Sequence, residues 1–244
     1  MSFFISSEDG YYALTTAGII LCVVLIVVLI LLTAFLGRKA KPESGVQIQN
    51  LNKNTNSKNG RDSMFSTKKL VFSAMAIALG YAASYVKILP MPWGGSITLC
   101  SMLFVTLIGY WYGPSIGLCA GFAYGLLQFI QDGGSYILSP LQVCFDYIIA
   151  FAALGCSGFF ANKKNGLVKG YLTAILVRGL FHTIGGYLYW MDYMPESFPA
   201  SLAVIYPIAY NYSYILAEGI ITIIILCLPP VQSAMTRVKK MAVG

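Results

Sequence analysis

The chain has 244 residues, of which 57% are hydrophobic and only 10% are charged, and its mean hydropathy is +0.72. Several uncharged runs are long enough to cross about 30 Å of hydrocarbon, which excludes a water-soluble protein. The net charge of +7 does not indicate nucleic-acid binding, because in a membrane protein the position of the basic residues sets the topology. The runs are continuous and do not alternate, so they indicate helices rather than barrel strands. We therefore predict an all-α integral membrane protein.

The N-terminal 66 residues divide into an apolar part and a polar part. Residues 10–37 carry no charge, follow an acidic stretch and precede a basic one. The positive-inside rule makes segment 1–37 a transmembrane anchor helix with its N-terminus outside, and its long apolar core argues against a cleaved signal peptide. Residues 38–66 are rich in Lys, Asn, Ser and Gly. They cannot bury enough apolar surface to fold, which predicts a cytoplasmic polar linker.

Residues 67–244 are predicted to form a membrane domain of six helices. The three basic clusters, at 38–69, 163–169 and 237–240, then all fall on the cytoplasmic side. The longest uncharged stretch is too long for one helix, and the pair Gly113-Pro114 divides it. The expected helices span about residues 67–89, 96–112, 115–131, 137–161, 168–191 and 203–230.

Small residues recur every four positions on the first helix of this domain. One set contains Ala74 and Ala78, and a second contains Ala76 and Gly80. Small side chains let another helix approach closely within a bilayer. The pattern is compatible with packing inside the bundle and with contact to a separate partner protein.

The segment YILSPLQVCFDY, residues 136–147, places the carboxylate of Asp146 in an otherwise apolar run. An ionisable group in hydrocarbon is costly, so it marks a functional site. On a helix, Ser139, Gln142 and Asp146 share one face because they are spaced three and four residues apart. We expect this polar face to line a cavity.

A second polar stripe lies on the helix predicted over residues 168–191. Arg178, His182, Gly186 and Trp190 recur every four residues, and His182 is the only histidine of the chain. Counted from the outer helix ends, His182 and Asp146 lie at similar depth, so we expect them to face each other. Arg178 lies deeper and is expected to form a structural ion pair with Asp146 or with Glu218.

Several aromatic residues and one amide residue are expected near the outer ends of the helices. Trp93 lies in the loop Met91–Ser96, and Tyr206, Tyr210 and Asn211 begin the last helix. Aromatic residues near a membrane boundary often serve only as interface anchors. Combined with a carboxylate and an imidazole, they predict an outward-facing cavity for a flat, cationic, hydrogen-bonding ligand.

Motifs for catalysis are missing from the sequence. It contains no GxSxG, no HExxH and no His and Cys set with metal-ligand spacing, so we predict neither an enzyme nor a metal or cofactor site. It also lacks the GxxxxGK[ST] loop, so ATP-driven transport would require another subunit.

The part from about residue 67 to residue 240 resembles the thiamine-specific substrate-binding (S) components of energy-coupling factor (ECF) transporters. YILSPLQVCFDY resembles the YILS…Q…EY segment of that family, and FHTIGGYLYW, residues 181–190, resembles its FHFIAG…FW segment. The helix with Ala74 and Ala78 resembles the AxxxA contact with the coupling subunit, and the spacing from Tyr206 to Asn211 matches a Tyr and Asn pair of the pocket.

This resemblance implies a six-helix S-component bundle, here preceded by one extra helix. It implies that the chain captures thiamine from outside the cell membrane, joins a transmembrane coupling subunit through Ala74 and Ala78, and depends on two cytoplasmic ATPases that bind the ATP. The residues expected to bind substrate are Tyr136, Asp146, Tyr147, His182, Gly186, Trp190, Tyr206, Asn211 and Trp93.

The chain departs from the family pattern in three respects. Asp146 stands where the family has Glu, one methylene longer, so the ligand could be thiamine or a relative of thiamine. Trp93 does not align cleanly with the aromatic residue that the family carries in this loop. The N-terminal helix and linker have no counterpart in the six-helix pattern.

Three other functions are compatible with the sequence. A stand-alone proton-coupled carrier would use Asp146, Arg178, His182 and Glu218 as a proton relay. An intramembrane enzyme would use Asp146 and His182 as acid and base, and a purely structural bundle would leave these polar groups without a ligand.

Overall fold

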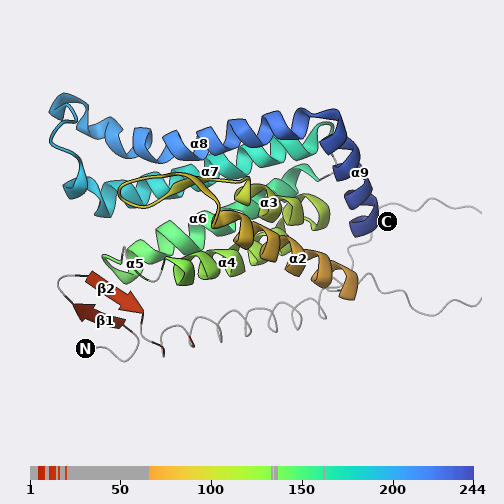
Figure 1. The fold of residues 1–244 in the computed structure, drawn as a ribbon, viewed down its shortest axis with the longest axis horizontal. Helices are drawn as coiled ribbons and strands as arrows, with labels where there is room; N and C mark the ends of the chain where they lie inside the picture. Colours follow the sequence, from red (N-terminus) through yellow and green to blue (C-terminus); the bar gives the residue numbers. More distant parts are fainter. Residues whose placement is uncertain are drawn as a thin grey trace, which may run out of the picture.

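The computed structural model describes residues 66–132, 134, 137–161 and 163–244, together with residues 5–8, 11–14, 16 and 20. Figure 1 shows long helices running side by side, with one helix, α9, crossing one end of them. The elements of the bundle are α2 (Thr67–Ser84), α3 (Ser101–Tyr112), α4 (Pro114–Gln131), α5 (Pro140–Val143), η1 (Cys144–Ile149), α6 (Ala150–Ala152), η2 (Ala153–Phe160), α7 (Gly166–Tyr189), η3 (Met191–Tyr193), η4 (Ala200–Ile205), α8 (Tyr206–Cys227) and α9 (Pro229–Val243).

Three helical segments of the described residues are long and apolar enough to cross a membrane. They are Pro140–Phe160, Gly166–Tyr189 and Ala200–Cys227, and the shorter α3 is also apolar. The first of them joins α5, η1, α6 and η2 into one span. With α2, α3 and α4 these spans make the six-helix bundle, so the predicted fold class is confirmed for this part of the chain.

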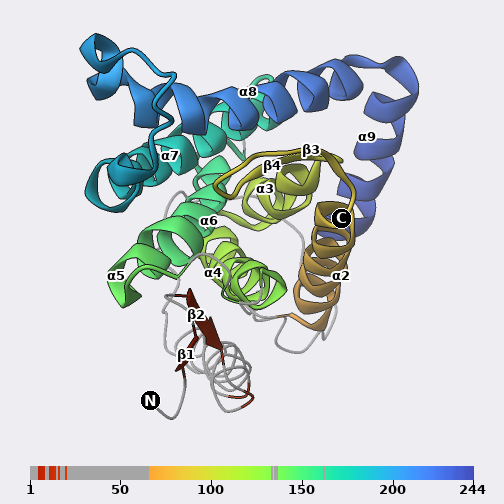
Figure 2. The same ribbon diagram turned by 60° about the vertical axis from the view of Figure 1, so that its left-hand side comes forward.

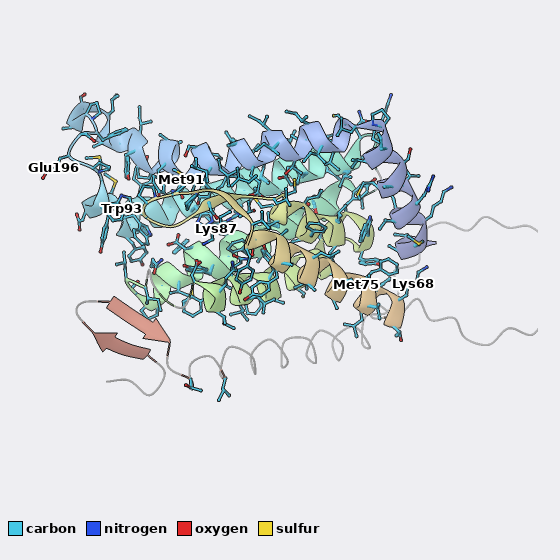
Figure 3. All side chains as sticks on the ribbon, viewed as in Figure 1. Lys68, Met75, Lys87, Met91, Trp93 and Glu196 are labelled. Carbon is cyan, nitrogen blue, oxygen red and sulfur yellow. The ribbon has the colours of Figure 1, made fainter. Side chains whose placement is uncertain are left out.

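The basic ends of the helices lie together. α2 and α7 begin next to Lys68 and Lys169, while α9 carries Arg237 and Lys240. Lys68 Nζ donates to the carbonyl oxygen of Gly244 at 2.9 Å, which joins the start of α2 to the end of α9. The positive-inside rule predicts that this end is cytoplasmic, and Figure 3 shows Trp93 at the opposite end, which the same rule predicts to be the outer one.

The first helix of the six-helix domain, expected over residues 67–89, is shorter than predicted, and a β-hairpin follows it. α2 ends at Ser84, and strand β3 (Lys87–Pro90) pairs antiparallel with β4 (Ser96–Thr98). Between the strands, Gly94 and Gly95 adopt positive φ values of 88° and 79°, a conformation that favours glycine. The helix expected over 96–112 therefore begins only at Ser101. Figures 1 and 2 both show the hairpin alongside α8.

A further helix occupies the C-terminal region, where the sequence indicated only a basic cluster. The last membrane helix ends at Cys227 rather than near residue 230, because Pro229 and Pro230 cannot continue its hydrogen bonding. Both prolines instead occupy the first turn of α9, a position that tolerates proline. α9 buries Ala242 and exposes Arg237 and Lys240.

The N-terminal prediction is corrected at one point. Strands β1 (Ile5–Glu8) and β2 (Tyr11–Leu14) form an antiparallel pair, so these residues are not part of the anchor helix predicted over segment 1–37. The remainder of the predicted anchor helix and linker lies outside the described residues.

Glycines bring α4 into close contact with the span Pro140–Phe160. A Cβ added at Gly117 would lie 2.6 Å from Gly109 Cα and 2.9 Å from Gly155 Cα. Cβ atoms at Gly121 and Gly125 would meet the backbone of Phe151 and Tyr147 in the same way. Close approach of this kind drives helix association where lipid removes the hydrophobic effect.

Candidate functional site

A cavity of about 190 Å³ lies among the membrane helices and the β3–β4 hairpin. Its wall contains eight of the nine residues expected to bind substrate, and the ninth, Tyr136, lies outside the described residues. These eight come from the hairpin, from η1, from α7 and the residue that follows it, and from α8. The eight are Trp93, Asp146, Tyr147, His182, Gly186, Trp190, Tyr206 and Asn211.

Asp146 is at the centre of a hydrogen-bond cluster. Its Oδ2 accepts from Gln142 Nε2 at 2.6 Å and from Trp190 Nε1 at 2.9 Å. Its Oδ1 lies 3.5 Å from His182 Nδ1, so the two residues face each other as predicted. A Cβ at Gly185 would come within 2.7 Å of Asp146 Oδ1, so only glycine there lets the carboxylate approach α7 this closely.

The π-helical turn η1 carries Asp146 and its neighbour Tyr147. Such turns insert one extra residue into an α-helix and occur frequently at functional sites. Ser139 caps the helix start by accepting from Gln142 N at 3.1 Å, and Gln142 is fully buried. The cap and the π turn together direct Gln142 toward Asp146 and the Tyr147 hydroxyl toward Asp132.

Arg178 does not form the ion pair expected from the sequence. Within the described residues its Nε donates to His182 Nε2 at 3.2 Å, and its guanidinium lies 4.2 Å from the centroid of the Phe151 ring. Because Nε2 of the imidazole accepts, the hydrogen lies on Nδ1 and points toward Asp146. Arg178, His182 and Asp146 therefore form a continuous line of polar contacts.

Glu218 was considered above as an ion-pair partner of Arg178, but its carboxylate instead accepts hydrogen bonds from backbone groups. Its carboxylate accepts from Thr98 N at 2.8 Å and from Met102 N at 3.2 Å, and the residue is 2% exposed. Met102 belongs to the first turn of α3, where free backbone N–H groups favour a negative charge. Glu218 thus joins α8 to β4 and to the start of α3.

Asp132 is a cavity residue that the sequence did not single out for this role. It follows α4 directly, lines the cavity, and accepts from the Tyr147 hydroxyl at 2.9 Å. Burial raises the pKa of Asp132, while the hydrogen bond from Tyr147 and the charge of Lys87 act in the opposite direction. The sequence did contain a signal for this role, because Asp132 lies close to two polar residues of the same helix, Gln128 and Gln131, which also line the cavity.

Asn211 and Gly186 serve the contact between α7 and α8. Asn211 Nδ2 donates to the carbonyls of His182 and Pro207, and its Oδ1 accepts from the Tyr214 hydroxyl at 3.1 Å. A Cβ at Gly186 would lie 2.8 Å from Pro207 Cβ. Both residues line the cavity, and both also hold its wall together.

Aromatic rings connect the hairpin to the Asp146 cluster. The Trp93 ring lies 5.8 Å from the ring of Tyr193, which lies 5.3 Å from that of Trp190. Tyr210 holds the same loop, because its hydroxyl accepts from Trp93 N at 2.9 Å and donates to Gly94 O at 3.0 Å. The Tyr206 ring lies 5.8 Å from that of Tyr210. The hairpin is thus built into the cavity wall.

The two small-residue sets on α2 face opposite directions. Ala76 and Gly80 are buried in the bundle, and a Cβ at Gly80 would lie 3.2 Å from Phe104 Cβ. Ala74 and Ala78 are exposed, next to exposed Met75. Figure 3 shows Met75 on the outside of the bundle.

Comparison with known proteins identifies the family. The profile of a family described as "Thiamine transporter protein" matches residues 70–238. The chain belongs to this family. It is therefore a membrane transport protein rather than an enzyme.

Individual relatives agree with this assignment. The "Thiamine transporter ThiT" of Bacillus subtilis is 32% identical over 171 residues, which cover 65% of this chain and 85% of that protein. The protein of the same name from Lacticaseibacillus paracasei is 30% identical over 121 residues, covering 43% and 59%. The structure of ThiT from Listeria monocytogenes superposes with a TM-score of 0.52 at 25% identity, covering 66% of this chain and 94% of that one.

Proposed function

We propose that the chain captures thiamine from the outer side of the membrane with high affinity. The observation that carries this proposal is the cluster of Asp146, Gln142, His182 and Trp190 in a cavity of the outer half. Thiamine joins a flat aminopyrimidine to a cationic thiazolium ring. The carboxylate can accept from the aminopyrimidine, and the indole can stack on either ring.

High affinity is consistent with this type of cavity. A nanomolar dissociation constant corresponds to about −12 kcal/mol, and a few desolvated aromatic and charged contacts supply most of the binding energy in such complexes. The wall offers the aromatic groups Trp190, Tyr193 and Tyr206, and Trp190 donates directly to Asp146. The polar partners of Asp146 are already oriented, which lowers the entropy lost on binding.

The titration of purified chain with thiamine tests this proposal through tryptophan fluorescence. Trp93 and Trp190 line the cavity, whereas the third tryptophan, Trp111, packs against Phe72 outside it. We expect saturable quenching at nanomolar thiamine that survives Trp111→Phe and shrinks in Trp190→Phe. Absence of a response at micromolar thiamine would contradict the proposal.

We further infer that uptake follows the ECF scheme, with a membrane coupling subunit and two ATPase subunits that bind the ATP. The exposed face of α2 around Ala74 and Ala78 supports this inference, because small residues there permit close approach of a partner helix. Ala78→Leu is expected to reduce ATP-driven uptake without changing thiamine affinity. Ala209→Leu is the matched control, since Ala209 is an exposed alanine of α8.

A proton-coupled carrier is the second candidate, and the line of contacts from Arg178 through His182 to Asp146 favours it. Measuring thiamine uptake by liposomes that contain only this chain distinguishes the proton-coupled carrier from the ECF scheme. Accumulation driven by a pH gradient would support the carrier. Accumulation that requires the coupling and ATPase subunits with ATP would support the ECF scheme.

A further inference from the structure

Helix α9 (Pro229–Val243) lies across the basic end of the bundle, where it contacts α2, α3 and α8. Figures 1 and 2 both show it turning away at the end of α8. With 15 residues it is about 22 Å long, too short to cross the hydrocarbon of a bilayer. The preceding membrane span, Ala200–Cys227, ends one residue before α9 begins. We therefore expect α9 to lie at the level of the lipid headgroups.

The side of α9 that faces the bundle is already occupied. Val231 packs against the hydrophobic core, and Ala242 is buried, with its carbonyl accepting from the Tyr112 hydroxyl at 3.2 Å. Lys239 Nζ donates to the Tyr110 hydroxyl at 3.0 Å and lies 4.4 Å from the centroid of that ring. Of the cations on α9, Lys239 is thus held by the bundle.

A second, exposed side of α9 is also apolar. Pro230, Ala234 and Met241 fall within about 40° of one another around a helix of 3.6 residues per turn. They lie in the wall of an open groove together with Arg237, and Met241 is 56% exposed. An exposed apolar stripe with a cation beside it is typical of a helix that lies in the membrane interface.

Two cations on the outer side of α9 have no carboxylate partner within the part of the chain that the structure describes. Arg237 and Lys240 are exposed, and their spacing of three residues makes them neighbours on the helix surface. The described carboxylates lie in the cavity, near the outer end or in β1, and they are Asp132, Asp146, Glu218, Asp192, Glu196 and Glu8. The outer side of α9 therefore carries positive charge that attracts anions.

We propose that the exposed side of α9 binds an anionic phospholipid of the leaflet at the basic end of the bundle. Arg237 and Lys240 contact the headgroup phosphate, for which the planar guanidinium of Arg237 provides paired donors. The lipid chains cover the apolar stripe with Met241. Free phosphate would leave this stripe exposed to water, so the charge and the stripe together fit a lipid.

The choice of a membrane over a protein partner follows from the position of α9. Basic residues immediately beside a membrane-spanning helix are attracted to anionic lipids, and α9 follows such a helix directly. Lys68 and Tyr112 connect α9 to α2 and α3, because each donates to a carbonyl at the end of α9. A lipid bound to α9 would thereby also hold the ends of these two helices at the membrane surface.

Native mass spectrometry of the purified full chain tests this proposal, by titration with phosphatidylglycerol and with phosphatidylcholine of identical acyl chains. We expect the chain to bind phosphatidylglycerol more tightly. The double variant Arg237→Gln with Lys240→Gln is expected to lower phosphatidylglycerol affinity about 10- to 30-fold, with phosphatidylcholine affinity unchanged. Met241→Ser is expected to weaken both lipids to a similar extent, because the stripe contacts the chains and not the headgroup.

The matched control is Lys163→Gln with Lys164→Gln, which removes two exposed cations from the same end of the bundle but not from α9. It is expected to keep the preference for phosphatidylglycerol. An equal loss in the control would show that attraction is spread over the whole surface and would overturn a site on α9. Displacement of the lipid by inorganic phosphate at equal concentration would overturn the lipid as the occupant.

Thermal unfolding and thiamine titration separate loss of the lipid site from loss of the fold. Both are expected to stay at wild-type values in the double variant, because Arg237 and Lys240 are exposed and lie far from the cavity wall. If the double variant unfolds, Lys240→Gln alone is expected to lose about fivefold in phosphatidylglycerol affinity. Unchanged lipid affinity in a folded variant that loses ATP-driven uptake would assign this side of α9 to a protein partner and overturn the inference.

Discussion

The outer and inner halves of the bundle are built by different means. The inner half packs backbone against backbone, with Gly109, Gly117 and Gly155 in mutual contact. The outer half interrupts its helices with a hairpin and a π turn, and these interruptions bring polar groups such as Asp146 into one cavity. We therefore expect substitutions at these three inner glycines to act mainly on stability, and substitutions at Asp146 to act mainly on binding.

The largest effect on binding is expected from Asp146→Asn. The substitution removes the charge that balances Arg178 through His182, so the cavity would present an uncompensated cation to a cationic ligand. The expected loss is about 2–4 kcal/mol of thiamine binding free energy, as for a charged hydrogen bond lost in a buried site. Isothermal titration measures it, and thermal unfolding should change much less. Unchanged affinity would remove Asp146 from the site.

Gly117→Val tests the inner half. The added side chain would collide with the backbone of Gly109 and Gly155, and overpacking of this kind costs about 1–3 kcal/mol of folding free energy. We expect a lower midpoint of thermal unfolding with thiamine affinity retained below it. Leu118→Val, at an exposed neighbour on α4, is the control. A selective loss of affinity in Gly117→Val would show that the halves are coupled.

Trp190→Phe makes a smaller change within the outer half. Phenylalanine keeps a ring for stacking but removes the Nε1–H that donates to Asp146 Oδ2. Loss of one such hydrogen bond is expected to weaken thiamine binding by about 1–2 kcal/mol. Trp111→Phe should have no effect on the affinity, and a similar loss in both variants would indicate a general effect on the fold.

Trp93→Phe is expected to have the smallest effect. Trp93 is 41% exposed, and its ring contacts Tyr193 rather than Asp146. The smaller ring should cost about 0.5 kcal/mol of binding free energy, within the range of one aromatic pair. Rapid mixing measures whether the change lies in the dissociation rate. A loss as large as that of Trp190→Phe would place Trp93 among the primary ligand contacts.

Much of the site followed from spacing along single helices. Asp146 and Gln142 share a face, and His182 lies at the depth of Asp146, so their meeting could be expected from residue counts. The hairpin could not be expected in this way, because the apolar run around Ile88 and Ile97 suits a helix or a strand equally well. For the same reason the helix predicted to begin at residue 96 begins only at Ser101, after strand β4.

The membrane class, the order of the helices and most residues of one cavity could be predicted from the residues alone. These follow from hydrophobicity, charge position and helical period, which act along the chain. The partners of the charged groups became visible only in the fold: Arg178 contacts His182, Glu218 caps α3, and Asp132 accepts from Tyr147. The physical reason is that such contacts depend on distances of a few ångströms between helices far apart in the sequence.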